Sequence, residues 1–192
     1  MKDQIVALDL RTLSFVTLTF SFVCGCGLIA FGKKHRKFSC IALIGYGFLM
    51  MGAGLTLLGL REVIDNFLSI IVANSLIYCS LVATYQGLFR LLQISMPFAK
   101  YLSAAGLGIL ISILSYFTYQ EYNVNARIIG FCCCYGSLYF LTIYGFIRSG
   151  RCFSDKPVRF LSVFFLIVGL YYVYRLFWTI DSLPLGKLMN AG

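Results

Sequence analysis

Formal charge is scarce in this 192-residue chain: Asp, Glu, Lys and Arg make up 12% of it, whereas 60% is hydrophobic. Soluble domains carry about a quarter charged residues, so this composition excludes an ordinary soluble domain and indicates lipid as the main solvent. The formal net charge is +9, but the basic residues lie in short clusters between long apolar stretches. That arrangement is typical of membrane loops, so we expect no nucleic-acid partner.

Groups that carry catalysis or hold metals are equally scarce. The chain has one histidine, His35, which excludes a two-histidine haem site and a paired-histidine zinc motif. It has no Gly-x-Ser-x-Gly elbow and no phosphate-binding glycine-rich loop. Cys132, Cys133 and Cys134 are consecutive, so in a helix they point to different sides and cannot share one metal. We therefore expect no catalytic residue, no metal and no cofactor, and we do not expect an enzyme.

Six apolar stretches are each long enough to cross a bilayer as a helix, since twenty residues at about 1.5 Å each reach about 30 Å. They predict an all-α, polytopic membrane helix bundle of six transmembrane helices, forming a single transmembrane domain over 1–192 without a soluble domain. The predicted helices cover about 12–31, 38–60, 66–89, 101–120, 128–147 and 160–180.

The second stretch is rich in small residues, which let neighbouring helices approach closely and predict a central place in the bundle. These residues are Gly45, Gly47, Gly52, Ala53 and Gly54. The third stretch has no formal charge but contains an amide, Asn74, that lipid cannot satisfy. Asn74 shares a helical face with Tyr78 and Tyr85, so we expect this polar stripe to face protein or water.

The basic residues are distributed unevenly over the loops. The loops after the first, third and fifth stretches hold ten bases and one acid, Asp155, whereas the opposite side holds six of each. The ten bases are Lys33, Lys34, Arg36, Lys37, Arg90, Lys100, Arg148, Arg151, Lys156 and Arg159. By the positive-inside rule, the basic side is cytoplasmic and both ends of this sequence are periplasmic in a bacterial inner membrane. We expect residues 183–192 to form an outer loop leading into one further helix.

Four arginines lie near the predicted outer ends of the helices, where basic residues are normally scarce. In one interpretation they form ion pairs with Asp9, Glu62, Asp65, Glu121 and Asp181, while Arg175 extends to the interface. In the other they line an outward-facing pocket for a small anionic ligand, because a guanidinium binds a carboxylate through two hydrogen bonds. The candidate ligand-binding residues are Arg11, Arg61, Asp65, Asn74, Tyr78, Arg127 and Arg175.

Three segments together resemble a known family. They are Leu-Asp-Leu-Arg-Thr-Leu at 8–13, Leu-Gly-Leu-Arg at 58–61 followed by Asp65 and by Phe-Leu-Ser-Ile-Ile-Val-Ala-Asn at 67–74, and Tyr-Gln-Gly-Leu-Phe-Arg at 85–90. The set resembles the N-terminal, seven-transmembrane-type sensor region of bacterial GGDEF diguanylate cyclases. The resemblance implies a sensor for a cyclase that makes cyclic di-GMP. It also implies truncation before the last helix and the cyclase domain, because the chain has no GGDEF motif.

We therefore expect a membrane-embedded signal-transducing module whose partners are membrane lipid, a small anionic ligand on the outer face and a second copy in a homodimer. The alternative is a small polytopic transporter or permease in which Asn74, Tyr78 and Tyr85 line a path. Transporters of this kind carry matching broken helices in their two halves, and the sequence pattern indicates none. This favours the sensor.

Overall fold

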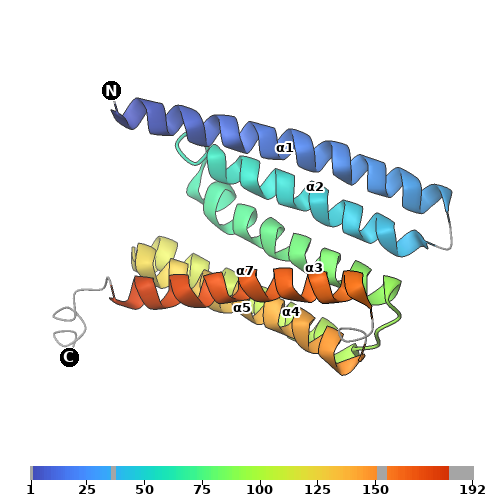
Figure 1. The fold of residues 1–192 in the computed structure, drawn as a ribbon. Coiled ribbons are helices and arrows are strands. Elements are labelled where there is room, and N and C mark those ends of the chain that lie inside the picture. Colours follow the sequence, from blue (N-terminus) through green and yellow to red (C-terminus); the bar gives the residue numbers. More distant parts are fainter. Residues whose placement is uncertain (1, 36–37, 151–154, 182–192) are drawn as a thin grey trace. The chain divides into compact units, whose positions relative to one another are not determined.

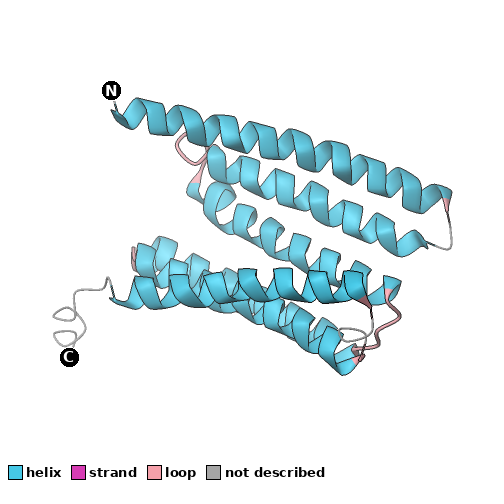
Figure 2. Ribbon diagram, viewed as in Figure 1, coloured by secondary structure: helices cyan, strands magenta, loops and turns pink. Residues whose placement is uncertain are grey.

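The computed structural model describes residues 2–35, 38–150 and 155–181, with the backbone alone at 2–14 and 97. These residues are helical apart from short connections, and none of them forms a strand (Figure 2). Six helical segments among them are long and apolar enough to cross a membrane. The predicted all-α polytopic bundle with six spans is confirmed. Residues 183–192, predicted as an outer loop, lie outside the described residues.

The helices extend past most of the predicted stretches. They are α1 (Lys2–Lys34), α2 (Ser39–Gly59), α3 (Ala73–Leu91), α4 (Pro97–Ser115), α5 (Val124–Arg148) and α7 (Lys156–Asp181) (Figure 1). α4 begins at Pro97. Proline suits this position because it has no N–H, and the first N–H groups of a helix have no hydrogen-bond partner within the helix. α5 begins four residues before its predicted start because Asn123 caps it: the Asn123 side chain accepts a hydrogen bond from the Ala126 N–H at 3.1 Å.

Two spans contain π-helical segments that the sequence pattern did not predict. η2 (Phe67–Val72) precedes α3, and η3 (Tyr116–Gln120) follows α4. Neither segment contains glycine or proline, so the residue types do not indicate the change from α-helical to π-helical winding. Single π-helical turns occur frequently at functional sites, which draws attention to these two helix ends.

Met1–Ser95 form one compact unit, in which α2 lies between α1 and α3 (Figure 1). α2 presents two pairs of glycines, each pair seven residues apart, to its neighbours: Gly45 and Gly52 to α1, and Gly47 and Gly54 to α3. A Cβ atom on Gly54 would lie 2.8 Å from the Ala73 carbonyl oxygen, closer than real Cβ contacts. The backbones therefore touch almost directly, and α2 is the middle helix of the first unit. Its central place in the six-helix bundle stays a prediction.

Met96–Gly192 form a second compact unit, in which α5 packs against α4 and α7. The contact between α5 and α7 consists largely of aromatic rings. Tyr172 of α7 stacks on Tyr139 at a centroid distance of 5.6 Å and lies 5.8 Å from Tyr135, which itself stacks on Phe131 at 3.9 Å. Each such ring pair contributes about 0.5–1.5 kcal/mol beyond its buried area. Aromatic rings form much of the interface between α5 and α7, whereas glycines form the interfaces of α2 with α1 and α3. The single-domain interpretation stays a prediction.

Candidate functional site

Among the residues whose side chains the structure describes, Arg127 is the only charged one that is buried, with 6% of its surface exposed. It lies in the first turn of α5, where its N–H donates to the Asn123 carbonyl oxygen at 3.3 Å. The Asn123 cap determines where the helix begins, and the helix start determines the direction in which the Arg127 side chain leaves the backbone. The local sequence thus directs the guanidinium towards the end of the preceding span.

Two side chains from the preceding part of the chain meet this guanidinium. Nη1 donates to Thr118 Oγ1 of η3 at 3.4 Å, which is long for a hydrogen bond. The centroid of the Tyr122 ring lies 4.9 Å from Cζ, a cation–π contact that contributes about 0.5–2 kcal/mol. Nη2 is buried and has no hydrogen-bond partner. Because an unsatisfied buried donor costs about 1–3 kcal/mol or more when charged, Arg127 lacks one strong partner.

Carboxylates do not supply that partner. Arg127, Arg61 and Arg175 form no ion pair with any carboxylate whose side chain the structure describes. Glu121 is close to Arg127 in sequence, but it is exposed, and its backbone N–H donates to the Tyr116 carbonyl oxygen. The ion-pair interpretation therefore finds no support at these three arginines.

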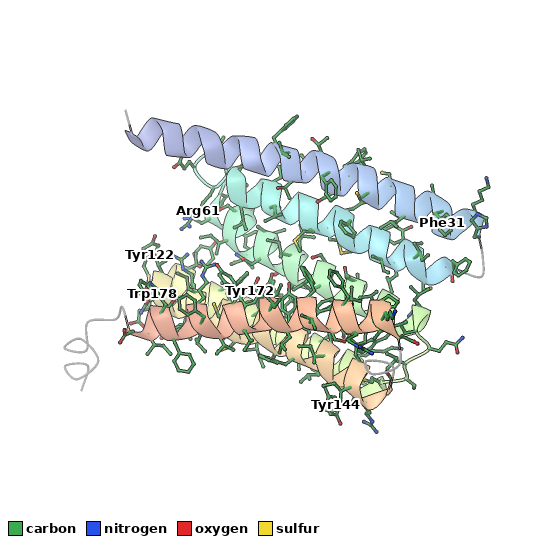
Figure 3. All side chains as sticks on the ribbon, in the orientation of Figure 1. Phe31, Arg61, Tyr122, Tyr144, Tyr172 and Trp178 are labelled. Carbon is green, nitrogen blue, oxygen red and sulfur yellow. The ribbon has the colours of Figure 1, made fainter. Side chains whose placement is uncertain are left out.

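Arg11 and Asp9 lie in α1, in the part whose side chains are outside the described set. Arg61 is exposed in the turn after α2, at the end of the first unit opposite Phe31 (Figure 3). Asp65 lies at the end of the same connection, and its Oδ1 accepts a hydrogen bond from the Phe67 N–H at 3.0 Å. The Asp65 carboxylate thus organises the start of η2.

The two tyrosines of the polar stripe on α3 are buried. Tyr78 and Tyr85 are 1% and 2% exposed. Asn74 is half-buried, and its Nδ2 donates to the Ile70 carbonyl oxygen, in η2, at 2.6 Å. This amide donor therefore serves its own helix, at the place where π-helical winding gives way to α-helical winding. Its role in ligand binding stays a prediction.

Arg175 of α7 has different surroundings from Arg127. It is exposed and lies within electrostatic range of Cys132 and Tyr172. One turn further along α7, the single tryptophan, Trp178, lies at the same end of the second unit as Tyr122 (Figure 3). An exposed arginine beside interfacial rings fits a side chain that extends along an apolar surface towards the head groups. The structure does not bring the two arginines into one hydrogen-bonded cluster.

The three consecutive cysteines do point to different sides. Cys132 and Cys134 are buried, whereas Cys133 is exposed. Within the described ranges, no group of three His, Cys, Asp or Glu side chains lies close enough to hold a metal ion. These thiols pack as small apolar groups.

The sequence interpretation missed Thr118 and Tyr122 as contacts of Arg127. Tyr122 comes five residues before Arg127, just outside α5, so its proximity could have been inferred from the start of the helix. Thr118 belongs to the preceding span, and only the packing of that span against α5 brings its hydroxyl to the guanidinium. No periodic pattern reports a contact of that kind.

The fold and these contacts define a multi-pass α-helical membrane protein. Among its described side chains, one arginine is buried and lacks a full set of partners. No protein-family model, curated protein or solved structure matches the chain. The resemblance to sensor regions of diguanylate cyclases therefore depends on the three sequence segments alone.

Proposed function

We propose that this protein is a sensory module of the bacterial inner membrane that controls a cytoplasmic diguanylate cyclase. In this proposal the basic loops are cytoplasmic and both ends of the sequence are periplasmic. The observation that carries the proposal is the packing of α2 through glycine faces against both α1 and α3. The three resembling segments support the same reading.

Glycine faces suit a signalling element because no large side chain locks one helix against the other. Gly47 of α2 approaches Ser80 and Thr84 of α3, and Gly45 approaches Gly25 of α1. Such an interface can exist in two packings that differ by a small shift, and a ligand favours one of them only by its differential affinity. The shift then passes through the last span to the cyclase, most simply across a homodimer.

The transporter alternative gains one observation and loses another. Among the described residues, the first unit contains the π-helical segment η2 and the second contains η3. Transporters carry broken helices at matching places in their two halves, so one irregular segment in each unit favours a transporter. Neither segment unwinds, however, so neither offers the free half-helix ends that hold substrates. The residues that would line a path are engaged in packing: Tyr78 and Tyr85 are buried, and the Asn74 donor is bonded to its own helix. The sensor remains the better-supported proposal.

Cyclic di-GMP measurement tests the proposal. The chain would be joined through one apolar helix to a GGDEF cyclase domain, and cyclic di-GMP would be measured at equal membrane abundance. We expect Gly54→Ala, whose Cβ would meet the Ala73 carbonyl oxygen, to change the output several-fold. The matched control is Gly27→Ala, which meets nothing within 4 Å and should leave the output unchanged.

Equal output from the wild type and both variants would contradict control of the cyclase by this packing. Solute uptake by proteoliposomes containing the purified chain would instead favour the transporter. The gene can also be read beyond the Gly192 codon, where a GGDEF reading frame would support the sensor.

A further inference from the structure

We propose that Arg127, Thr118 and Tyr122 form a binding site for an oxyanion, supplied either by a lipid phosphate or by a small soluble carboxylate or phosphate. The site deepens the ligand part of the proposed function. It nevertheless concerns binding alone, which is measured on the purified protein and does not require the chain to signal.

The first step of the argument is charge. A guanidinium stays protonated at every physiological pH, so burial cannot neutralise Arg127. More than nine-tenths of its surface is buried, Nη2 has no hydrogen-bond partner, and no described carboxylate pairs with it. A positive charge in these surroundings requires a negative one, and the described side chains do not supply it.

The second step is the position of the guanidinium. Arg127 lies in the first turn of α5, where the helix dipole already favours negative charge. Thr118 Oγ1 accepts from Nη1, and a hydroxyl that accepts one bond can still donate another to an anion. Nη2, Thr118 Oγ1 and the helix end together offer donors of the kind that oxyanions bind.

The third step is access. Tyr122 covers the guanidinium with its ring, yet 71% of the Tyr122 side chain is exposed. The residues on either side are held by backbone hydrogen bonds to η3, from Glu121 N–H to Tyr116 and from Asn123 N–H to Phe117. The Tyr122 ring can therefore turn aside without unwinding a helix.

The membrane level of the site is compatible with two sources of the oxyanion. Tyr122 lies at the same end of its unit as Trp178, and both rings are exposed (Figure 3). Exposed tyrosine and tryptophan rings are typical of the head-group region, where lipid phosphates and soluble anions both have access. The two sources share the same chemistry and are separated by experiment.

The test uses the full chain purified in a neutral maltoside detergent. Acetate and inorganic phosphate are titrated against thermal unfolding, with chloride at matched ionic strength as the reference. In a second arm, nanodiscs of phosphatidylcholine with or without phosphatidylglycerol are analysed by native mass spectrometry for retained lipid. Stabilisation by acetate or phosphate identifies a soluble oxyanion, and retained phosphatidylglycerol identifies a lipid phosphate. Both results support the site.

We expect Arg127→Gln to weaken binding of the responding probe about tenfold or more, the effect of losing hydrogen bonds to a charged group. Arg148→Gln is the matched control: it removes the same charge from the exposed far end of α5 and should leave binding unchanged. Should Arg127→Gln fail to fold, Thr118→Val removes only the hydroxyl and is expected to weaken binding as well.

Tyr122→Ala separates a binding site from a merely structural contact. Because the ring has to turn aside before an anion can reach the guanidinium, its removal should raise the affinity about two- to fivefold, while Tyr122→Phe keeps the wild-type affinity. A structural cation–π contact would lower stability without changing affinity. The proposal is overturned if no probe distinguishes the wild type from the Arg127 and Thr118 variants, and equally if Tyr122→Ala leaves the affinity unchanged. If either outcome overturns the site but the cyclic di-GMP output still responds to Gly54→Ala, the proposed function stands without this site.

Discussion

At the residue scale, polar groups in the spans are mostly satisfied by their own helix. Ser80 Oγ donates to the Ile77 carbonyl oxygen at 2.6 Å, Thr142 Oγ1 to that of Leu138 at 2.8 Å, and Ser162 Oγ to that of Val158 at 2.8 Å. Hydroxyls that bond back in this way need no tertiary partner in lipid. Ser69 Oγ, Ser75 Oγ and Arg127 Nη2 are buried without a hydrogen-bond partner, and of these three residues only Arg127 carries a charge, which makes it the candidate site.

The cap of α5 can be tested at a single residue. Asn123→Ala removes the oxygen that accepts from the Ala126 N–H, so we expect the free energy of unfolding to fall by about 1 kcal/mol. Asn125→Ala, inside the same first turn, is the control and should have a smaller effect. Thermal unfolding of the purified protein in detergent measures both. Equal effects would mean that the Asn123 side chain does not cap the helix.

Close backbone approach is also a property of single residues. A Cβ atom on Gly47 would lie 2.8 Å from the Ser80 carbonyl oxygen, so Gly47→Ala must push α3 away from α2. We expect a loss of about 1–3 kcal/mol in stability, as for other overpacked positions. Gly27→Ala meets no atom within 4 Å and should be neutral or stabilising by up to about 1 kcal/mol. Unfolding in increasing dodecyl sulfate compares the two, and equal stabilities would contradict the packing of α2 on α3.

At the scale of elements, the two units solve the same packing problem differently. α2 is central in the first and contacts its neighbours through glycines, whereas α5 contacts α7 through a series of rings. Apolar side chains gain nothing by leaving lipid, so helices in a membrane associate through close contact or specific side-chain interactions. Close backbones allow small shifts, while interleaved rings resist them. The first unit is therefore the more adaptable element of the proposed sensor.

The ring series can be tested in α7. Tyr172 contacts Phe131, Tyr135 and Tyr139, so we expect Tyr172→Ala to lower the free energy of unfolding by about 3 kcal/mol. Phe177→Ala removes a ring of similar size that is 66% exposed and should cost less than about 1 kcal/mol. Tyr172→Phe keeps the rings in place and should resemble the wild type. Comparable losses for Tyr172→Ala and Phe177→Ala would contradict the ring contacts as the basis of this interface.

At the scale of the whole molecule, orientation depends on where the bases lie. The cytoplasmic assignment uses ten bases and one acid in alternate loops, and it requires no tertiary contact. Alkaline phosphatase fused after Gly192 should be active, because that end is expected in the periplasm. The same reporter inserted between Lys34 and His35 should be silent. The opposite pair of results would reverse the proposed topology and move the Arg127 site to the cytoplasmic face.

The amino-acid sequence by itself determined the six spans, the close approach of neighbouring helices to the glycines of α2, and the burial of Tyr78 and Tyr85 on α3. These features depend on hydrophobicity, glycine and polar groups within one helix, and such properties can be read locally. Most predicted ends were short because hydropathy detects the apolar stretch, whereas helical hydrogen bonding continues to a cap such as Asn123.

Only the tertiary structure decided which groups surround Arg127 and where the helices adopt π-helical winding. Thr118 and Arg127 lie on different helices, so their contact depends on how the two helices pack. The residue pattern of either helix alone does not indicate it. η2 and η3 likewise contain residues that α-helices accept equally well. Contacts between helices are properties of the fold, and for that reason the site could be proposed from sequence but located only in three dimensions.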